Sequence, residues 1–159
     1  METGRSEKVS FSYHKIYTDV LIDAFPDVVW SVLADTQNYG RWAAFLVGIE
    51  GEITDGGKIT AAFQFDPKKK KLSKIDHAIS VVPGQEFFWA EKGPGGIRDN
   101  HHFKVEAAED GKSRFIQSDE IMGGMTFLMG ARLSKMYVEG YQAFNRGLKA
   151  EAERRANGG

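Results

Sequence analysis

Residues 113–148 read SRFIQSDEIMGGMTFLMGARLSKMYVEGYQAFNRGL, and the spacing of their apolar side chains decides the fold. Ser113–Met122 is interpreted as a strand, on one face of which Phe115, Gln117, Asp119 and Ile121 lie. From Met125 the apolar side chains repeat every three or four positions as far as Leu148, which predicts a long amphipathic helix. Such a helix of about 30 residues would reach roughly 45 Å, enough to span a whole small domain.

Strand-like alternation also runs through the chain before this stretch. After the first strand, Pro26 suits the first turn of a helix over Asp27–Ala34, and Thr36 begins a second short helical segment that ends near Trp42. The remaining strands follow one another through short turns, so we expect them to pair antiparallel. The strands predicted in this way are Tyr13–Asp23, Phe45–Ile53, Ile59–Phe65, Ile75–Val81, a segment around Phe87 and Trp89, Ile97–Ala107 and Ser113–Met122.

The order of these elements predicts an α+β fold, in which a curved antiparallel sheet of about seven strands wraps around the long C-terminal helix. Two short helices after the first strand are expected to close one end. A length of 159 residues fits a single domain, which we place over residues 11–155, with a flexible tail at 1–10 and a flexible end at 156–159. A helix that crosses a strongly curved sheet need not fill the space beneath it, so we expect an internal cavity there.

Composition narrows the function. The chain carries 21 basic and 22 acidic residues, a net charge of −1, which argues against a nucleic-acid binder. It has no cysteine, which excludes a disulfide framework, a thiol nucleophile and a thiolate metal site. It has neither a run of about 18 apolar residues nor an apolar segment at the N-terminus, so we expect no transmembrane segment, no secretory signal and a cytoplasmic location. The lysines of Lys68–Lys71 are expected to form a solvated turn.

Two neighbouring strands place polar side chains on the face that should turn inward. His101 shares a face with Phe103, and Gln117 and Asp119 share a face with Phe115. A buried polar group without a partner costs about 1–3 kcal/mol, so these groups must satisfy one another or a ligand. Two interpretations stay open: a purely structural network, or an acid/base pair of His101 and Asp119 that acts on an enolisable molecule.

Aromatic residues make up 12% of the chain, and aromatic side chains line apolar pockets as well as filling cores. The four histidines lack the spacing of a metal site, so we expect no metal and no cofactor. The loop Gly93–Gly96 lacks the spacing of a nucleotide-binding loop and is interpreted as a turn or as a lid over the cavity. The residues expected to bind a ligand are Trp42, Phe45, Phe63, Phe65, Ile75, Phe87, Trp89, His101, Phe103, Phe115, Gln117, Asp119, Met125, Met129, Leu133, Tyr137 and Tyr141.

Several short sequence segments, in a fixed order, resemble those of a known family. They are Val29–Asp35 followed by Trp42, then Val82–Trp89, His101–Phe103, Ser113–Asp119 and Gly140–Lys149. Together they cover about residues 10–153, and their order and spacing resemble the START/Bet v 1-like superfamily, in particular its polyketide cyclase/dehydrase-like (SRPBCC) branch. The resemblance implies a helix-grip fold around a hydrophobic cavity that binds lipids, sterols, polyketides or hormones.

The first hypothesis is therefore that the chain transports, senses or sequesters a hydrophobic or amphipathic small molecule, such as a lipid or a polyketide. A second hypothesis is a cyclase, dehydratase or hydrolase that uses His101 and Asp119 in the same cavity, although no motif of the sequence establishes an enzyme. A third, by resemblance to co-chaperone members, is a protein-interaction domain, which predicts little cavity and an apolar surface patch instead. We expect a monomer or a homodimer.

Overall fold

The computed structural model describes residues 1–92 and 94–158, without the side chains of Glu91 and Pro94. Eight strands form one antiparallel sheet in the order β1-β2-β8-β7-β6-β5-β4-β3. The strands are β1 (Glu2–Ser10), β2 (Tyr13–Ile22), β3 (Leu46–Glu50), β4 (Lys58–Phe63), β5 (Ser73–Val82), β6 (Glu86–Lys92), β7 (Arg98–Ala107) and β8 (Ser113–Met122). The helices are α1 (Pro26–Ala34), α2 (Tyr39–Trp42) and α3 (Thr126–Ala156), with 3₁₀ turns η1 (Thr36–Asn38), η2 (Pro94–Gly96) and η3 (Glu109–Gly111).

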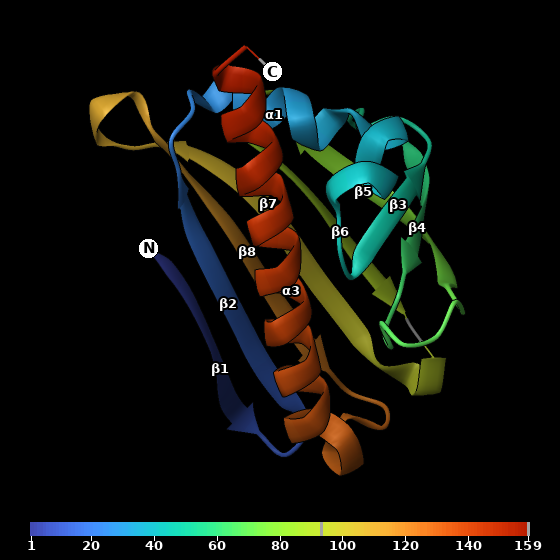
Figure 1. Cartoon of the computed structure of the whole chain (residues 1–159). Helices are drawn as coiled ribbons and strands as arrows, with labels where there is room; N and C mark the ends of the chain where they lie inside the picture. Colours follow the sequence, from blue (N-terminus) through green and yellow to red (C-terminus); the bar gives the residue numbers. More distant parts are fainter. Residues whose placement is uncertain (93, 159) are drawn as a thin grey trace.

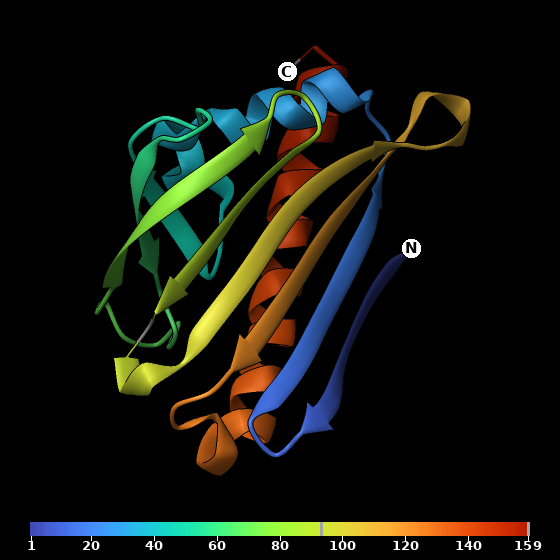
Figure 2. The ribbon, with the colours of Figure 1, turned by 180° about the vertical axis from the view of Figure 1, so that it is seen from behind.

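Helix α3 crosses the concave face of the sheet, and the sheet curves around it (Figures 1 and 2). Tyr141, Phe144 and Leu148 are among its buried side chains, and they recur at helical spacing on one face. Helix α1 packs beside the C-terminal part of α3 and closes that end of the molecule (Figure 1). The predicted α+β helix-grip fold is thereby confirmed. Within the described residues, no helix combines the length and the apolar composition needed to cross a membrane.

Strand β1 departs from the flexible tail expected over residues 1–10. It pairs antiparallel with β2 in a register that places Glu2 opposite Val20. Its sequence has no apolar face from which a strand could be predicted, and nearly all its side chains are exposed in the structure. Backbone pairing holds it on the sheet, together with polar contacts such as the ion pair of 3.1 Å between Glu2 and Arg146 of α3. The sheet gains an eighth strand as a result.

The other elements begin and end within a few residues of the predicted positions. One difference has a clear cause: β3 begins at Leu46 because Phe45 has a φ of 69°, a left-handed conformation that a strand cannot continue through. Strand β4 ends at Phe63, so Phe65 lies in the turn that follows. Helix α3 reaches Ala156, the first residue of the end that was expected to be flexible. Gly159, the last residue of that end, lies outside the described residues.

A glycine allows α3 to approach Phe45, the residue before β3, closely. A Cβ atom at Gly140 would overlap the ring of Phe45, so a larger residue requires that ring to move. The Phe45 ring packs edge-on against Phe63, Tyr137 and Tyr141, with ring centroids 5.7 Å apart in each pair. This aromatic cluster fixes the distance between the helix and the sheet at the place where a cavity begins.

Candidate functional site

A cavity of about 360 Å³ lies between α3 and strands β4, β5, β7 and β8. Small-molecule sites usually enclose about 300–1,000 Å³, so the space is large enough for a ligand. The wall is mostly apolar, and it includes half-buried side chains such as Ile97, Leu133 and Met136 together with the exposed Lys74, so the cavity is open to solvent. The cavity is lined by Phe63, Phe65, Ser73, Lys74, Ile75, His77, Ile97, Asp99, His101, Ile121, Leu133, Met136, Tyr137 and Tyr141.

The residues predicted to bind a ligand fall into three groups. The first group lines the cavity and consists of Phe63, Phe65, Ile75, His101, Leu133, Tyr137 and Tyr141. The second group lies in the core outside this lining and consists of Trp42, Phe45, Phe87, Trp89, Phe103, Phe115, Gln117 and Asp119. The third group, Met125 and Met129, is exposed near the start of α3.

Packing between rings explains the second group. Phe87 stacks on Phe103 with ring centroids 4.4 Å apart, and Trp42 packs edge-on against Phe144 of α3 at 5.1 Å. These rings fill the space between helix and sheet where no cavity is left. Alternation along a strand tells which face a side chain occupies, but it does not tell how far along the strand the cavity lies.

Several lining residues escaped the prediction. His77 shares the inward face of β5 with Ile75, and Asp99 shares that of β7 with His101. Strand alternation could therefore have predicted that both side chains face the cavity. Met136 lies on the apolar stripe of the long helix. The lining residues absent from the prediction are Ser73, Lys74, His77, Ile97, Asp99, Ile121 and Met136.

A chain of hydrogen bonds runs from the cavity wall into the core. His101 Nε2 lies 2.9 Å from Gln117 Oε1. Gln117 Nε2 donates to Asn145 Oδ1 at 2.7 Å and to the backbone carbonyl of Tyr141 at 3.2 Å. Asn145 Nδ2 donates in turn to Thr18 Oγ1 at 3.1 Å. All of these side chains are buried, so the network satisfies polar groups that water cannot reach.

The direction of this chain fixes the tautomer of His101. Because Gln117 donates through Nε2, its Oε1 can only accept, and His101 Nε2 must carry the hydrogen. Burial lowers the pKa of His101 well below its usual 6.5, so the ring is neutral and Nδ1 keeps a lone pair. Nδ1 has no hydrogen-bond partner among the residues that the structure describes, and the ring lines the cavity. His101 therefore offers a hydrogen-bond acceptor to a ligand.

Asp119 and Tyr141 form a second buried pair. The Tyr141 hydroxyl donates to Asp119 Oδ2 at 2.5 Å, and the backbone N–H of Asn100 donates to Oδ1 at 3.2 Å. Burial raises the pKa of Asp119, and burial together with the Asp119 carboxylate raises the pKa of Tyr141 well above 10. Within the described chain no hydrogen bond joins His101 to Asp119. His101 and Asp119 belong instead to two neighbouring pairs, whose Tyr141 and His101 rings lie 4.4 Å apart, and their role as an acid/base pair stays a prediction.

The loop expected to act as a turn or a lid lies partly outside the described residues, because Gly93 is not described. The carbonyl of Gly95 accepts a hydrogen bond of 3.1 Å from the N–H of Met125, which ties the loop to the start of α3. Its role as a lid stays a prediction. In residues 1–92 and 94–158, no three His, Asp or Glu side chains gather in a way that could hold a metal ion.

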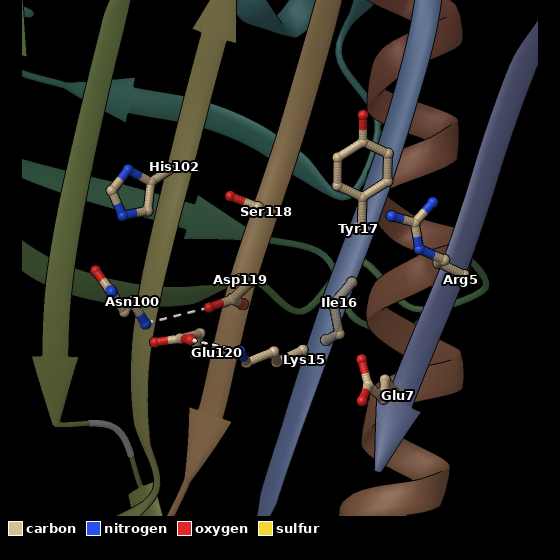
Figure 3. A pocket seen from close by; sticks show the side chains of 10 residues that line it. All are labelled: Arg5, Glu7, Lys15, Ile16, Tyr17, Asn100, His102, Ser118, Asp119 and Glu120. Atoms are coloured by element: carbon tan, nitrogen blue, oxygen red, sulfur yellow. Dashed lines mark hydrogen bonds and ion pairs between the residues drawn. The ribbon is translucent and has the colours of Figure 1, made fainter. Parts of the chain in front are cut away.

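A second hollow, of about 340 Å³, lies on the outer face of the sheet, over β1, β2, β7 and β8. Figure 3 looks onto this face, with α3 behind the strands, so the sheet separates the hollow from the cavity. Two of its cationic groups have contacts within the hollow: Lys15 forms an ion pair of 3.8 Å with Glu120, and the Arg5 guanidinium lies 4.2 Å above the Tyr17 ring. We assign no ligand to this outer hollow.

Solved structures with a similar fold include two aromatase/cyclases. The di-domain aromatase/cyclase StfQ from the steffimycin biosynthetic pathway matches with a TM-score of 0.75 and 11% identity, over 92% of this chain and 53% of that one, so this chain spans about half of that protein. The Zhui aromatase/cyclase from a Streptomyces species matches with a TM-score of 0.71 and 17% identity, over 92% and 99% of the two chains. A START superfamily protein from Mycobacterium smegmatis matches with a TM-score of 0.67 and 12% identity, over 91% and 97%.

These identities are low, and they establish a common fold rather than a common activity. A search of curated proteins finds no match to this chain. A family model described as polyketide cyclase / dehydrase and lipid transport matches residues 13–153, which is nearly the whole chain. The match confirms the resemblance seen in the sequence. This chain belongs to the polyketide cyclase/dehydrase and lipid transport family.

Proposed function

We propose that this chain binds an apolar or amphipathic small molecule, such as a lipid or a polyketide, in the cavity beneath α3. The observation that carries the proposal is a space of about 360 Å³ with a mostly apolar wall. Burial of apolar surface contributes roughly 25 cal/mol per Å² and has no direction, so such a wall favours an apolar ligand without fixing its shape. A protein-interaction domain would not require this cavity.

The polar part of the wall supports a finer proposal, that the ligand carries a hydroxyl group that donates to His101 Nδ1. The other ring nitrogen is occupied by Gln117, and the neutral ring has no charge to attract a carboxylate. Asp99 also lines the cavity, where it already has an interaction of its own. Lys74 lines it too, but its ammonium group forms an ion pair with Glu50.

Native mass spectrometry on protein purified without detergent tests the proposed function. We expect a stoichiometric adduct, which organic extraction should identify as an apolar or amphipathic compound. Leu133→Trp places an indole in the cavity lining and should remove the adduct, whereas Leu128→Trp, on an exposed position of the same helix, should keep it. A bare wild-type mass, with no rise in melting temperature from a panel of apolar ligands, would contradict the proposal.

A series of naphthalenes tests the preference for a hydroxyl donor. 2-Naphthol can donate a hydrogen bond, 2-methoxynaphthalene can only accept one, and 2-naphthoate is an anion at neutral pH. One net hydrogen bond of about 1 kcal/mol predicts that 2-naphthol binds roughly fivefold more tightly than the methoxy compound, and 2-naphthoate should bind most weakly. Equal affinities, or tightest binding of 2-naphthoate, would refute the hydroxyl preference while leaving cavity binding intact.

The second hypothesis, an enzyme, is favoured by the position of the Tyr141–Asp119 pair beside a neutral His101. Burial lowers the pKa of His101, which lines the cavity, and raises that of Asp119, which connects to the cavity through the Tyr141 hydroxyl, so His101 and Tyr141 are placed to exchange protons with an enolisable ligand. His101→Gln and Tyr141→Phe should each lower kcat about a hundredfold or more in a cyclisation or dehydration assay. A pH–rate profile that neither substitution changes would reject this assignment.

A further inference from the structure

Six large apolar side chains are exposed at one end of the molecule. We call them the apolar tip: Val9, Phe11, Met125, Phe127, Leu128 and Met129. The most exposed are Phe11 at 74%, Leu128 at 68% and Phe127 at 55%. Single exposed apolar side chains are ordinary on protein surfaces, whereas a contiguous group indicates contact with something apolar.

Two segments that are far apart in the sequence form the tip. Val9 and Phe11 come from the end of β1 and the turn into β2, and the other four side chains come from the start of α3. The N–H of Gly123 donates a hydrogen bond of 2.9 Å to the carbonyl of Ser12, which ties the turn to the segment that leads into α3. Figures 1 and 2 both show the β1–β2 turn beside the start of α3, at the end opposite the C-terminus. The tip therefore combines both segments at this end of the molecule.

Cationic side chains accompany the tip. The Lys8 ammonium lies 4.4 Å from the centre of the Phe11 ring. The Arg98 guanidinium lies beside Gly123, where an added Cβ would be 3.9 Å from Arg98 Nε. Arg132 is exposed one turn further along α3. Within the described part of the chain, none of these three cations forms an ion pair, so their charge is available to anionic groups outside the protein.

The tip also lies near part of the cavity lining. Leu133, which lines the cavity, lies one helical turn after Met129 on α3. Ile97, also in the lining, follows the loop whose Gly95 carbonyl accepts the hydrogen bond from Met125. The tip and this part of the cavity wall therefore share the start of α3.

We propose that the apolar tip inserts into the interfacial region of an anionic lipid bilayer, with Lys8, Arg98 and Arg132 against the headgroups. The cavity would then exchange its ligand with the bilayer; this second step rests on the proposed binding function, whereas docking does not. Inserted apolar side chains and basic groups together give the two signals that stable but reversible membrane binding requires. Two acidic side chains of the neighbouring strands, Glu7 and Glu120, lie in the outer hollow (Figure 3).

Flotation with lipid vesicles tests docking. Vesicles of phosphatidylcholine with one quarter phosphatidylglycerol are compared with vesicles of phosphatidylcholine alone. We expect the wild-type chain to float with the anionic vesicles at about 0.1 M NaCl, where charges act over about 10 Å. Raising the salt to about 1 M, or removing phosphatidylglycerol, should lower the bound fraction severalfold, because both weaken the attraction of the cations.

A matched pair of variants locates the contact. Phe127→Ser/Leu128→Ser removes two of the most exposed side chains of the tip and should lower vesicle partitioning by at least about tenfold. Phe25→Ser removes a side chain that is 63% exposed beside α1, at the opposite end, and should leave partitioning unchanged. Both variants should bind 2-naphthol in solution as the wild type does, which separates loss of docking from loss of fold or cavity.

Three results would overturn the proposal. The first is a wild-type chain that stays with the unbound fraction at low salt. The second is a double variant that floats as well as the wild type, or a Phe25→Ser chain that loses flotation equally. The third is a wild-type chain that does not float but forms a dimer by sedimentation, with the double variant monomeric, because the tip would then bind a second copy.

Discussion

At the scale of single residues, burial determines which side chains can take part in chemistry. His101 is 1% exposed and stacks between Phe103 and Tyr141, with ring centroids 4.0 and 4.4 Å away. Water is excluded on both ring faces, so the imidazolium ion is disfavoured and the neutral ring persists. Because Nε2 donates its hydrogen to Gln117, the ring keeps one hydrogen-bond acceptor, which is Nδ1. The same side chain at the surface would be a solvated pH-sensitive base.

Replacing His101 by Phe should cost about 1–3 kcal/mol of unfolding free energy at pH 7.5, because Gln117 Oε1 loses its donor. The folded-state pKa of His101 is depressed, so its contribution to wild-type stability is present above pH 6.5 and is lost as the pH falls below that value. The Phe variant lacks this loss, so the difference in unfolding free energy between the wild type and the variant should narrow from pH 7.5 to pH 5.

Urea unfolding at both pH values measures this gap. His102→Phe is the control, because His102 faces outward on the same strand and pairs with Glu86 at 2.6 Å, where water can replace the lost partner. A gap for His101→Phe that widens on acidification would contradict the neutral state of the ring.

Tyr141→Phe should destabilise the fold by about 1–3 kcal/mol, because the buried Asp119 carboxylate loses a donor. The Tyr141 hydrogen bond also opposes the rise in the pKa of Asp119, so removing it should raise that pKa further. A raised carboxyl pKa favours folding at low pH, and the loss should therefore shrink as the pH falls. Tyr137→Phe is the control, since the Tyr137 hydroxyl forms no hydrogen bond within the described chain. Equal losses for the two variants would contradict this account.

The sequence predicted which side of the sheet these polar groups occupy, but not what they contact. Strand alternation placed His101, Gln117 and Asp119 on the inner face, and all three are buried there. Their partners Asn145 and Tyr141 come from α3. The rotation and position of that helix over the sheet result from packing of the whole core, so spacing within one segment could not reveal them.

At the scale of elements, long periodic segments were predictable and segments without an apolar pattern were not. Helix α3 carries a clear helical period and was found from it. Strand β1 carries almost no apolar residue and is held through the backbone of β2, so its own sequence contains no strand signal. The start of β3 was misplaced because nothing in the sequence marks a left-handed Phe45.

Gly140→Ala tests the close contact between Gly140 of α3 and the Phe45 ring. The new methyl group would overlap the Phe45 ring, and overpacking of this kind costs about 1–3 kcal/mol, which the better helix propensity of alanine offsets by up to about 1 kcal/mol. We expect a net loss of stability and weaker ligand binding, because Phe45 supports three rings that line the cavity.

Gly40→Ala in α2 is the matched control, since no atom lies within 4 Å of a Cβ there. It should be neutral or slightly stabilising in the same thermal unfolding experiment. If Gly140→Ala were as stable as Gly40→Ala, the contact would be looser than the structure indicates.

At the scale of the whole molecule, the cavity results from how one helix meets one curved sheet. Core rings such as Phe103 and Phe144 fill the space toward α1, and the space toward the start of α3 stays open. The order of elements was enough to predict the fold and to expect a cavity. Its position along the strands depends on where the large side chains of both elements meet, which is a property of the assembled core.

The most direct test of the central claim is an NMR titration of 2-naphthol into protein with labelled isoleucine methyl groups. We expect saturable shifts and ligand contacts at Ile75, Ile97 and Ile121, which line the cavity. Ile22 and Ile49, which are buried in the core outside that lining, should stay unchanged. Shifts centred on Ile22 or Ile49, or no saturable shift at any methyl group, would contradict a ligand site beneath α3.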